Sequence, residues 1–185
     1  MKTLRHFLFA ACALIALTCA AGDPDPIISS IDDAYQHAKE LTKKNKSLGN
    51  EMVTTLNYTV RGQGKTTETL HFFYNTAEGT YLLDDDGDPH FFYYPLYLVT
   101  RKYNIGKKKY YEEYLFDSQS QRLLFVSTQD YDQNGKRFDR RFYINDGSVY
   151  KIIGPAMAPF MEDNVIYMAD DLLHAFDWII RNPKE

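Results

Sequence analysis

The spacing of hydrophobic residues divides this chain into two helical segments separated by a long section of strands. In the first segment, apolar side chains fall three or four positions apart, at Ile31, Ala34, Tyr35, Ala38 and Leu41. That spacing places them on one face of a helix. We expect the helix to begin at Ser29 or Ser30, with Ser30 as its N-cap, and to end near Gly49.

From Glu51 onward the hydrophobic period becomes two, which is typical of strands. The expected strands are 51–60, 67–74, 80–83, 90–103, 109–116, 123–131, 137–144 and 148–153. Turn dipeptides such as Asn134-Gly135 and Asp146-Gly147 separate them, so we expect a meander of hairpins and an antiparallel sheet. Pro95 interrupts the longest strand, which indicates an edge strand, a bulge or two separate strands.

Helical spacing returns near the C-terminus, from about Met161 to Arg181, and Asn182-Pro183 ends it. The apolar stripe there is Val165, Met168, Ala169, Leu172, Ala175, Phe176 and Ile179. Two amphipathic helices and one sheet predict a single α+β domain over residues 29–185. In it, an antiparallel meander of about six to eight strands has an N-terminal and a C-terminal helix packed on it, both covering one face.

The first residues predict a secretory signal peptide over 1–21 and a short leader over 22–28. Lys2 and Arg5 precede an apolar run from Phe7 to Leu17, and small residues follow. The run is shorter than the roughly 20 residues that a membrane-spanning helix needs. We therefore expect an exported protein, either periplasmic or secreted.

Two cleavage sites compete within this segment. Cleavage after Ala21 releases a soluble protein, whereas cleavage before Cys19 leaves a lipoprotein anchored to a membrane surface through Cys19. The soluble form would lack both cysteines of the chain, Cys12 and Cys19, and with them thiol catalysis and cysteine-based zinc sites.

The charge balance and the absence of catalytic motifs narrow the function classes. The chain has 21 Lys and Arg against 25 Asp and Glu, whereas nucleic-acid-binding proteins are expected to be basic. No G-x-S-x-G, H-E-x-x-H or phosphate-binding glycine loop is present. Glu112 and Glu113 are adjacent, so on a strand they point to opposite faces and cannot form an acid–base pair. We expect a protein that is not an enzyme and has no cofactor.

One pattern resembles a calcium loop. Asp130, Asp132 and Asn134 precede Gly135 at the spacing of alternate oxygen ligands, but Arg141 stands at the twelfth position, where a glutamate would complete the site. The same residues also fit a polar hairpin turn. The acidic turn 84–88 offers a second calcium candidate, and it too fits a solvated hairpin tip.

Tyrosines and lysines provide the binding candidates. The chain contains 15 Tyr and 12 Phe, and the aromatic runs put rings on both faces of their strands. This predicts either a second covering layer or an exposed aromatic surface suited to binding. A basic hairpin tip adds cations that either contact an anionic partner or protect strand edges. The candidates are Tyr93, Tyr94, Tyr110, Tyr111, Lys107, Lys108 and Lys109.

The middle of the chain resembles a loose group of small exported bacterial proteins of unknown function. The shared pattern is a pair of hairpins, carried here by Tyr114, Phe116, Asp117, Leu123, Phe125 and Val126, then Asn134, Gly135, Arg140 or Arg141, Tyr143, Asp146 and Gly147. The resemblance implies an exported, sheet-rich, non-catalytic domain and assigns no functional residues.

Our first hypothesis is an exported binding protein that acts on a macromolecular partner, such as another protein or an envelope component, as an inhibitor, immunity protein or assembly factor. The alternative is a carbohydrate-binding or small-ligand-binding protein with an aromatic-lined pocket, and an enzyme comes third. A flat tyrosine-rich patch would favour the first, a concave aromatic cavity the second, and close carboxylates in a deep cleft the third.

Overall fold

The computed structural model describes residues 25–45, 50–62, 64–76, 80–83, 89–132, 134–155 and 162–181. The expected signal peptide, both cysteines and the acidic turn 84–88 lie outside the described residues. Neither described helix is long and apolar enough to cross a membrane.

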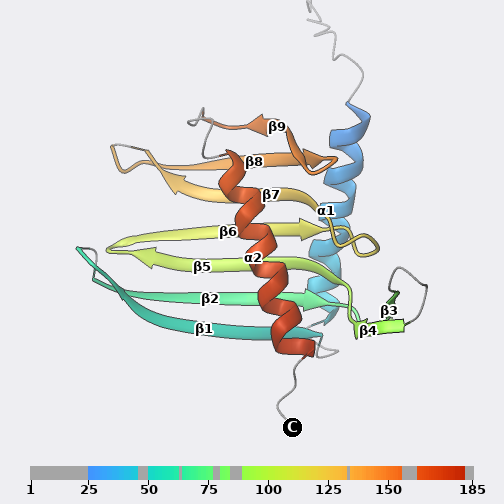
Figure 1. Ribbon diagram of the computed structural model, residues 1–185. Coiled ribbons are helices and arrows are strands. Elements are labelled where there is room, and N and C mark those ends of the chain that lie inside the picture. Colours follow the sequence, from blue (N-terminus) through green and yellow to red (C-terminus); the bar gives the residue numbers. More distant parts are fainter. Residues whose placement is uncertain are drawn as a thin grey trace, which may run out of the picture.

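The core of the fold is a seven-stranded sheet in which every neighbouring pair is antiparallel. Its order is β1 (Glu51–Val60), β2 (Gly64–Tyr74), β5 (Leu96–Ile105), β6 (Lys108–Phe116), β7 (Leu123–Tyr131), β8 (Arg137–Asn145) and β9 (Ser148–Ile153). The predicted meander is therefore confirmed (Figure 1).

A small second sheet is inserted between β2 and β5. It consists of β3 (Thr80–Leu83) and β4 (Pro89–Tyr93), which pair with each other. The long strand expected over 90–103 is divided around Pro95 into β4 and β5, because proline cannot donate a hydrogen bond to a strand ladder. Of the three interpretations of Pro95, two separate strands is the one observed.

The first helix, α1 (Pro26–Asn45), begins earlier than the expected Ser29 or Ser30. Asp25 is the cap, because its Oδ1 accepts hydrogen bonds from the backbone N–H groups of Ile27 at 3.0 Å and Ile28 at 3.4 Å. Pro26 suits the first helical position, where its missing N–H has no helical partner to lose. The last three residues of the expected leader 22–28 are therefore helical.

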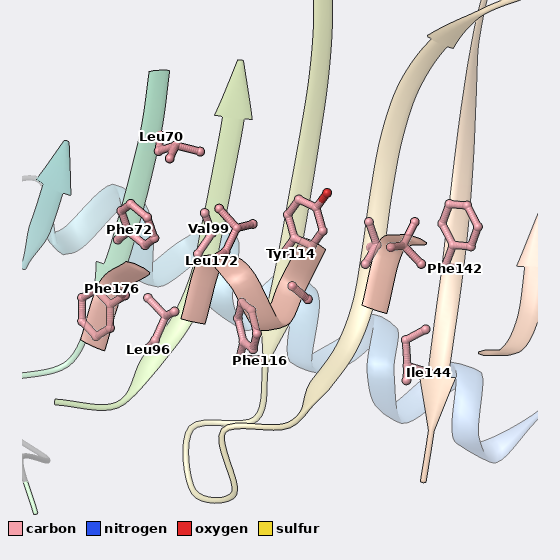
Figure 2. Close-up of a cluster of buried hydrophobic side chains, with 13 residues drawn as sticks. Leu70, Phe72, Leu96, Val99, Tyr114, Phe116, Phe142, Ile144, Leu172 and Phe176 are labelled. Atoms are coloured by element: carbon pink, nitrogen blue, oxygen red, sulfur yellow. The ribbon is translucent and has the colours of Figure 1, made fainter. Parts of the chain in front are cut away.

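The two helices cover opposite faces of the sheet, which corrects our expectation that both lie on one face. The C-terminal helix, α2 (Glu162–Arg181), lies in front of the sheet in Figure 1 and α1 lies behind it. Figure 2 shows Leu172 and Phe176 of α2 directed at Phe72 and Val99 of the sheet. On the other face, Ile31 and Ala38 of α1 belong to a separate cluster.

Strand alternation explains why both faces need a helix. Neighbours such as Tyr114 and Leu115 are both buried, and they belong to different clusters. A sheet with apolar residues at consecutive positions exposes a hydrophobic face unless both sides are covered. The aromatics on both faces are thus accounted for over the helix-covered part of the sheet by a second layer, one of the two interpretations offered by the sequence.

The α2 stripe is largely as expected: Met168 packs against the core as predicted, and Ile166 and Leu173 pack against it in addition. Val165, Ala169, Leu172 and Phe176 are buried, as predicted, whereas Ile179 is 41% exposed and Ile180 packs against the core in its place. The helix boundaries agree with the expected range to within one residue.

Helix α1 covers only part of its face. It crosses the sheet near the ends of β6 and β8 at which Leu115 and Tyr143 lie, and it leaves the part toward the β5–β6 and β7–β8 turns open (Figure 1). Along β6 the consequence is a gradient, from buried residues at Glu112–Phe116 to exposed ones at Lys108 and Lys109. The candidate site lies on this uncovered part.

Candidate functional site

A hollow of about 710 Å³ lies on the face of the sheet that α1 leaves uncovered. Strand pairing and alternation place nine of its lining residues on that face, because they share the side of Glu113, which contacts α1. These nine are Thr67, Thr69, Lys102, Asn104, Lys109, Tyr111, Gln129, Tyr131 and Arg137. The site is thus built from five adjacent strands, β2 and β5 to β8.

Tyr103 and Tyr110 also border the hollow, but strand alternation directs their rings to the α2 face. There the two rings stack, with centroids 5.0 Å apart and an interplanar angle of 7°. The hydroxyl of Tyr103 donates to Glu112 Oε1 at 2.8 Å. The adjacent candidates Tyr110 and Tyr111 therefore serve different faces, and Tyr111 is the one whose ring lies on the hollow's side.

The hollow is strongly cationic. Lys102, Lys107, Lys109 and Arg137 line it, and none of its lining residues is acidic. Among the described residues, no carboxylate lies within ion-pair distance of these four cations. Lys102 lies over the Tyr111 ring, 5.5 Å from its centroid. On a chain whose net charge is −4, four cations without a carboxylate partner around one hollow create a local field that attracts anions.

Asn104 fixes the shape of the hollow where β2 and β5 stop pairing at Glu68 and Tyr103. Its Oδ1 accepts a hydrogen bond from the Thr67 backbone N–H at 3.0 Å, and its Nδ2 donates to the Lys65 carbonyl at 3.2 Å. The amide side chain thus takes the place of the missing ladder bonds, and it holds the β5–β6 hairpin against β2.

Tyr131 fixes the side of the hollow opposite Asn104. Its hydroxyl donates to the Lys109 carbonyl at 3.2 Å and accepts from the Lys109 backbone N–H at 3.4 Å. The ammonium of Lys108 lies 5.2 Å from the centroid of the Tyr131 ring, a cation–π distance. Of the three candidate lysines, Lys107 and Lys109 line the hollow, whereas Lys108 contacts Tyr131 and is not among its lining residues.

The Tyr111 ring is anchored from the end nearest α1. Its hydroxyl donates to Glu113, which also accepts hydrogen bonds from Lys39 and Tyr35 of α1. Burial and the bond to Glu113 raise the pKa of Tyr111. Burial alone would raise the pKa of Glu113, but the bonds from Lys39, Tyr111 and Tyr35 outweigh it and hold that pKa below its ordinary value.

A second polar cluster lies on the α2 face, beside a smaller hollow of about 220 Å³. Arg101 donates to Glu68 at 2.6 Å and to Glu112 at 3.1 Å. Tyrosine hydroxyls donate to the same carboxylates, from Tyr58 to Glu68 and from Tyr103 and Tyr114 to Glu112. All four carboxylate oxygens have donors, so both carboxylates are hydrogen-bonded within the cluster.

The calcium candidates are engaged in other contacts. Asp130 Oδ2 accepts hydrogen bonds from Arg140 at 3.3 Å and from the Thr128 hydroxyl at 3.1 Å. Asp132 Oδ1 accepts from the backbone N–H groups of Asn134 at 2.9 Å and Lys136 at 2.8 Å, which stabilises the turn. Within the described part of the chain, no group of three His, Cys, Asp or Glu residues is arranged to hold a metal ion.

Of the remaining tyrosine candidates, Tyr94 is not among the residues that line the hollow. Tyr94 lies with its ring centroid 5.8 Å from that of Tyr74, which packs on the α2-face core. The side chain of Tyr93 lies outside the described residues. Sequence reasoning missed Gln129 and Arg137, although pairing the predicted hairpins and following every second residue places both on the Tyr111 side.

No protein-family model matches the chain, and no curated protein or solved structure is similar enough to it to count as a match. The resemblance to small exported bacterial proteins therefore stays a prediction.

Proposed function

We propose that this chain is an exported, non-enzymatic binding protein whose ligand is an acidic oligosaccharide. The observation that carries the proposal is the hollow beyond α1, in which four cations without a carboxylate partner surround a site that no carboxylate lines. The hollow is open and shallow, and the convergence of cations on it supports the ligand-binding alternative.

The neutral groups of the hollow favour a sugar among anionic ligands. Thr69 and Gln129 offer a hydroxyl and an amide, which can pair with sugar hydroxyls, and Tyr111 offers an aromatic ring. The volume of about 710 Å³ falls in the range of small-molecule sites, roughly 300–1,000 Å³. Carboxylate or sulfate groups on the sugar would meet Lys102 and Arg137.

The non-enzymatic part of the proposal rests on the carboxylates nearest the hollow. Glu113 is 4% exposed and is held by Lys39 and two tyrosines, and Glu112 lies on the other face. Neither is free to take up a proton from a ligand in the hollow. Export is supported by the charged and apolar pattern of residues 1–21.

Calorimetric titration with tetragalacturonate, and with the same oligomer fully methyl-esterified, tests the proposal. The ester keeps the sugar and removes its charge, so we expect binding at least about tenfold weaker than that of the acid. Lys102→Gln should weaken the acid's binding by about fivefold, as expected for one exposed ion pair. Lys151→Gln, an exposed lysine on β9, is the matched control. Equal binding of acid and ester would contradict the proposal.

A macromolecular partner is the second candidate, and a different surface favours it. On α2, Trp178 is 73% exposed and Tyr167 is 65% exposed, and their spacing of eleven residues places them on the same side of the helix. Exposed aromatics of this kind are common at protein interfaces. A pull-down from an envelope extract tests this candidate. If Trp178→Ser no longer recovers the proteins that the native chain recovers, and Lys102→Gln still does, this second candidate is favoured.

A further inference from the structure

The two edges of the sheet differ in how they are protected against pairing. The sheet ends at β1 on one side and at β9 on the other (Figure 1). Strand β9 has six residues, carries the exposed Lys151 and pairs with β8 through an irregular register, all of which blunt an edge. Strand β1 has ten residues and pairs with β2 without a register shift.

No such protection exists along β1. From Met52 to Val60 it contains no charged residue, no proline and no glycine. Its side chains are mostly of strand-forming types, and Val53, Leu56 and Tyr58 are 52%, 44% and 40% exposed. A long, uncharged edge with exposed apolar residues is a template for another strand.

The backbone groups that face outward can be identified from the pairing with β2. The Tyr74 N–H donates to the Asn50 carbonyl at 3.3 Å, in line with the register of β1 and β2. In an antiparallel pair, hydrogen-bonded and non-hydrogen-bonded residues alternate. The even-numbered residues of β1 are therefore bonded to β2, and Val53, Thr55, Asn57 and Thr59 direct their N–H and C=O groups outward.

We propose that two copies of this chain pair antiparallel through β1, joining their sheets across a twofold axis at Leu56. In this register Thr55 faces the partner's Asn57 and Val53 faces the partner's Thr59, so the outward groups of both copies meet. Leu56 faces the partner's Leu56 as a non-hydrogen-bonded pair, with Cα atoms about 4.5 Å apart.

The charge pattern of β1 favours a second copy of the chain as the strand that pairs with it. It also favours this register. Nine consecutive residues, Met52 to Val60, meet their counterparts without placing like charges opposite each other. At each end of the paired segment, Glu51 comes opposite the partner's Arg61, an attractive pair. If the twofold axis were at Thr55 or Asn57, Glu51 would no longer face the partner's Arg61.

The axis stands normal to the sheet, so the α1 faces of both copies lie on one side. The two cationic hollows then open in the same direction, although the pairing itself does not depend on what the hollows bind. Sedimentation equilibrium of the full chain should give twice the mass of one chain. Thr55→Pro removes an outward N–H without touching the bonds to β2, so it should give the monomer mass with an unchanged circular dichroism spectrum.

Disulfide trapping tests the register, in the full chain with Cys12→Ser and Cys19→Ser. Leu56→Cys should cross-link spontaneously across the twofold axis, because its Cα separation suits a disulfide. Thr54→Cys is the matched control: it faces the partner's Tyr58, about 13 Å from the equivalent residue, and should stay uncross-linked. A monomer at every concentration, cross-linking of both variants alike, or open polymers through β1 and β9 would overturn the proposal.

Discussion

Glu112 and Glu113 are consecutive residues of β6, yet each is buried on a different face of the sheet and bound by its own cation. Glu112 meets Arg101 from the neighbouring strand, whereas Glu113 meets Lys39 from α1. The interior therefore contains two separate polar clusters, one below each helix. Each cluster can be tested by its own substitutions, because the sheet lies between the two.

The first prediction concerns Glu113. In Glu113→Gln the ammonium of Lys39 and the hydroxyls of Tyr35 and Tyr111 lose a carboxylate acceptor, so we expect the free energy of unfolding to fall by about 2 kcal/mol. Urea denaturation measures it. Glu40→Gln, an exposed residue of the same helix, should stay within about 0.5 kcal/mol of the native chain. Equal losses in both variants would show that the cluster does not stabilise the fold.

The second prediction concerns the loss of folding stability at acidic pH. The pKa values of Glu113 and Glu68 are held below the ordinary value of 4.5, because their hydrogen-bond donors outweigh burial. Such groups contribute stability that is complete above pH 4.5 and is lost as pH falls through the lower, folded-state pKa. The urea midpoint should thus be insensitive to these groups near neutral pH and fall below pH 4.5. If the urea midpoint of Glu113→Gln fell below pH 4.5 as much as that of the native chain, this explanation would be contradicted.

The third prediction concerns Arg101, whose guanidinium bridges Glu68 and Glu112 through different nitrogens. Arg101→Lys supplies the charge but not the planar fork, so one carboxylate loses its partner. We expect a loss of stability of about 2 kcal/mol, and about 3 kcal/mol or more for Arg101→Met, which leaves both buried carboxylates without a cation. Full rescue by lysine would show that charge alone matters at this position.

The fold was largely predictable because its elements follow clear periods, but the two-sided covering was not. Consecutive apolar residues such as Tyr114 and Leu115 indicate that both faces of the sheet are covered. The hydrophobic period of a helix, however, does not say which face that helix covers. The start of α1 differs from the expected one because the cap is Asp25 and Pro26 occupies the first helical position, where proline is tolerated.

The site was predictable only in part, because it joins residues from five strands. Lys107, Lys109 and Tyr111 stood out as a cluster in the sequence. Arg137 did not, since it reaches the hollow only through strand register. The extent of the hollow depends on how far α1 runs across the sheet, and local sequence patterns do not encode that.

The fourth prediction concerns Asn104, which bridges β2 and β5 beyond their last ladder pair. Asn104→Ala should lower stability by about 1 kcal/mol and speed hydrogen exchange at the Thr67 amide. Because the lining of the hollow then loses a support, binding of an acidic oligosaccharide should weaken although no cation is removed. Unchanged exchange at Thr67 would contradict the bridging role.

The most direct test of the central claim is to map where an acidic sugar binds. Tetragalacturonate added to the ¹⁵N-labelled chain should shift amide resonances around the hollow, at Thr67–Thr69, Lys102–Asn104, Lys109–Tyr111 and Gln129–Tyr131. The methyl ester should shift those resonances much less at the same concentration. No shift with the acid, or shifts centred on Tyr167 and Trp178 instead, would contradict the assignment of the hollow as an anionic-sugar site.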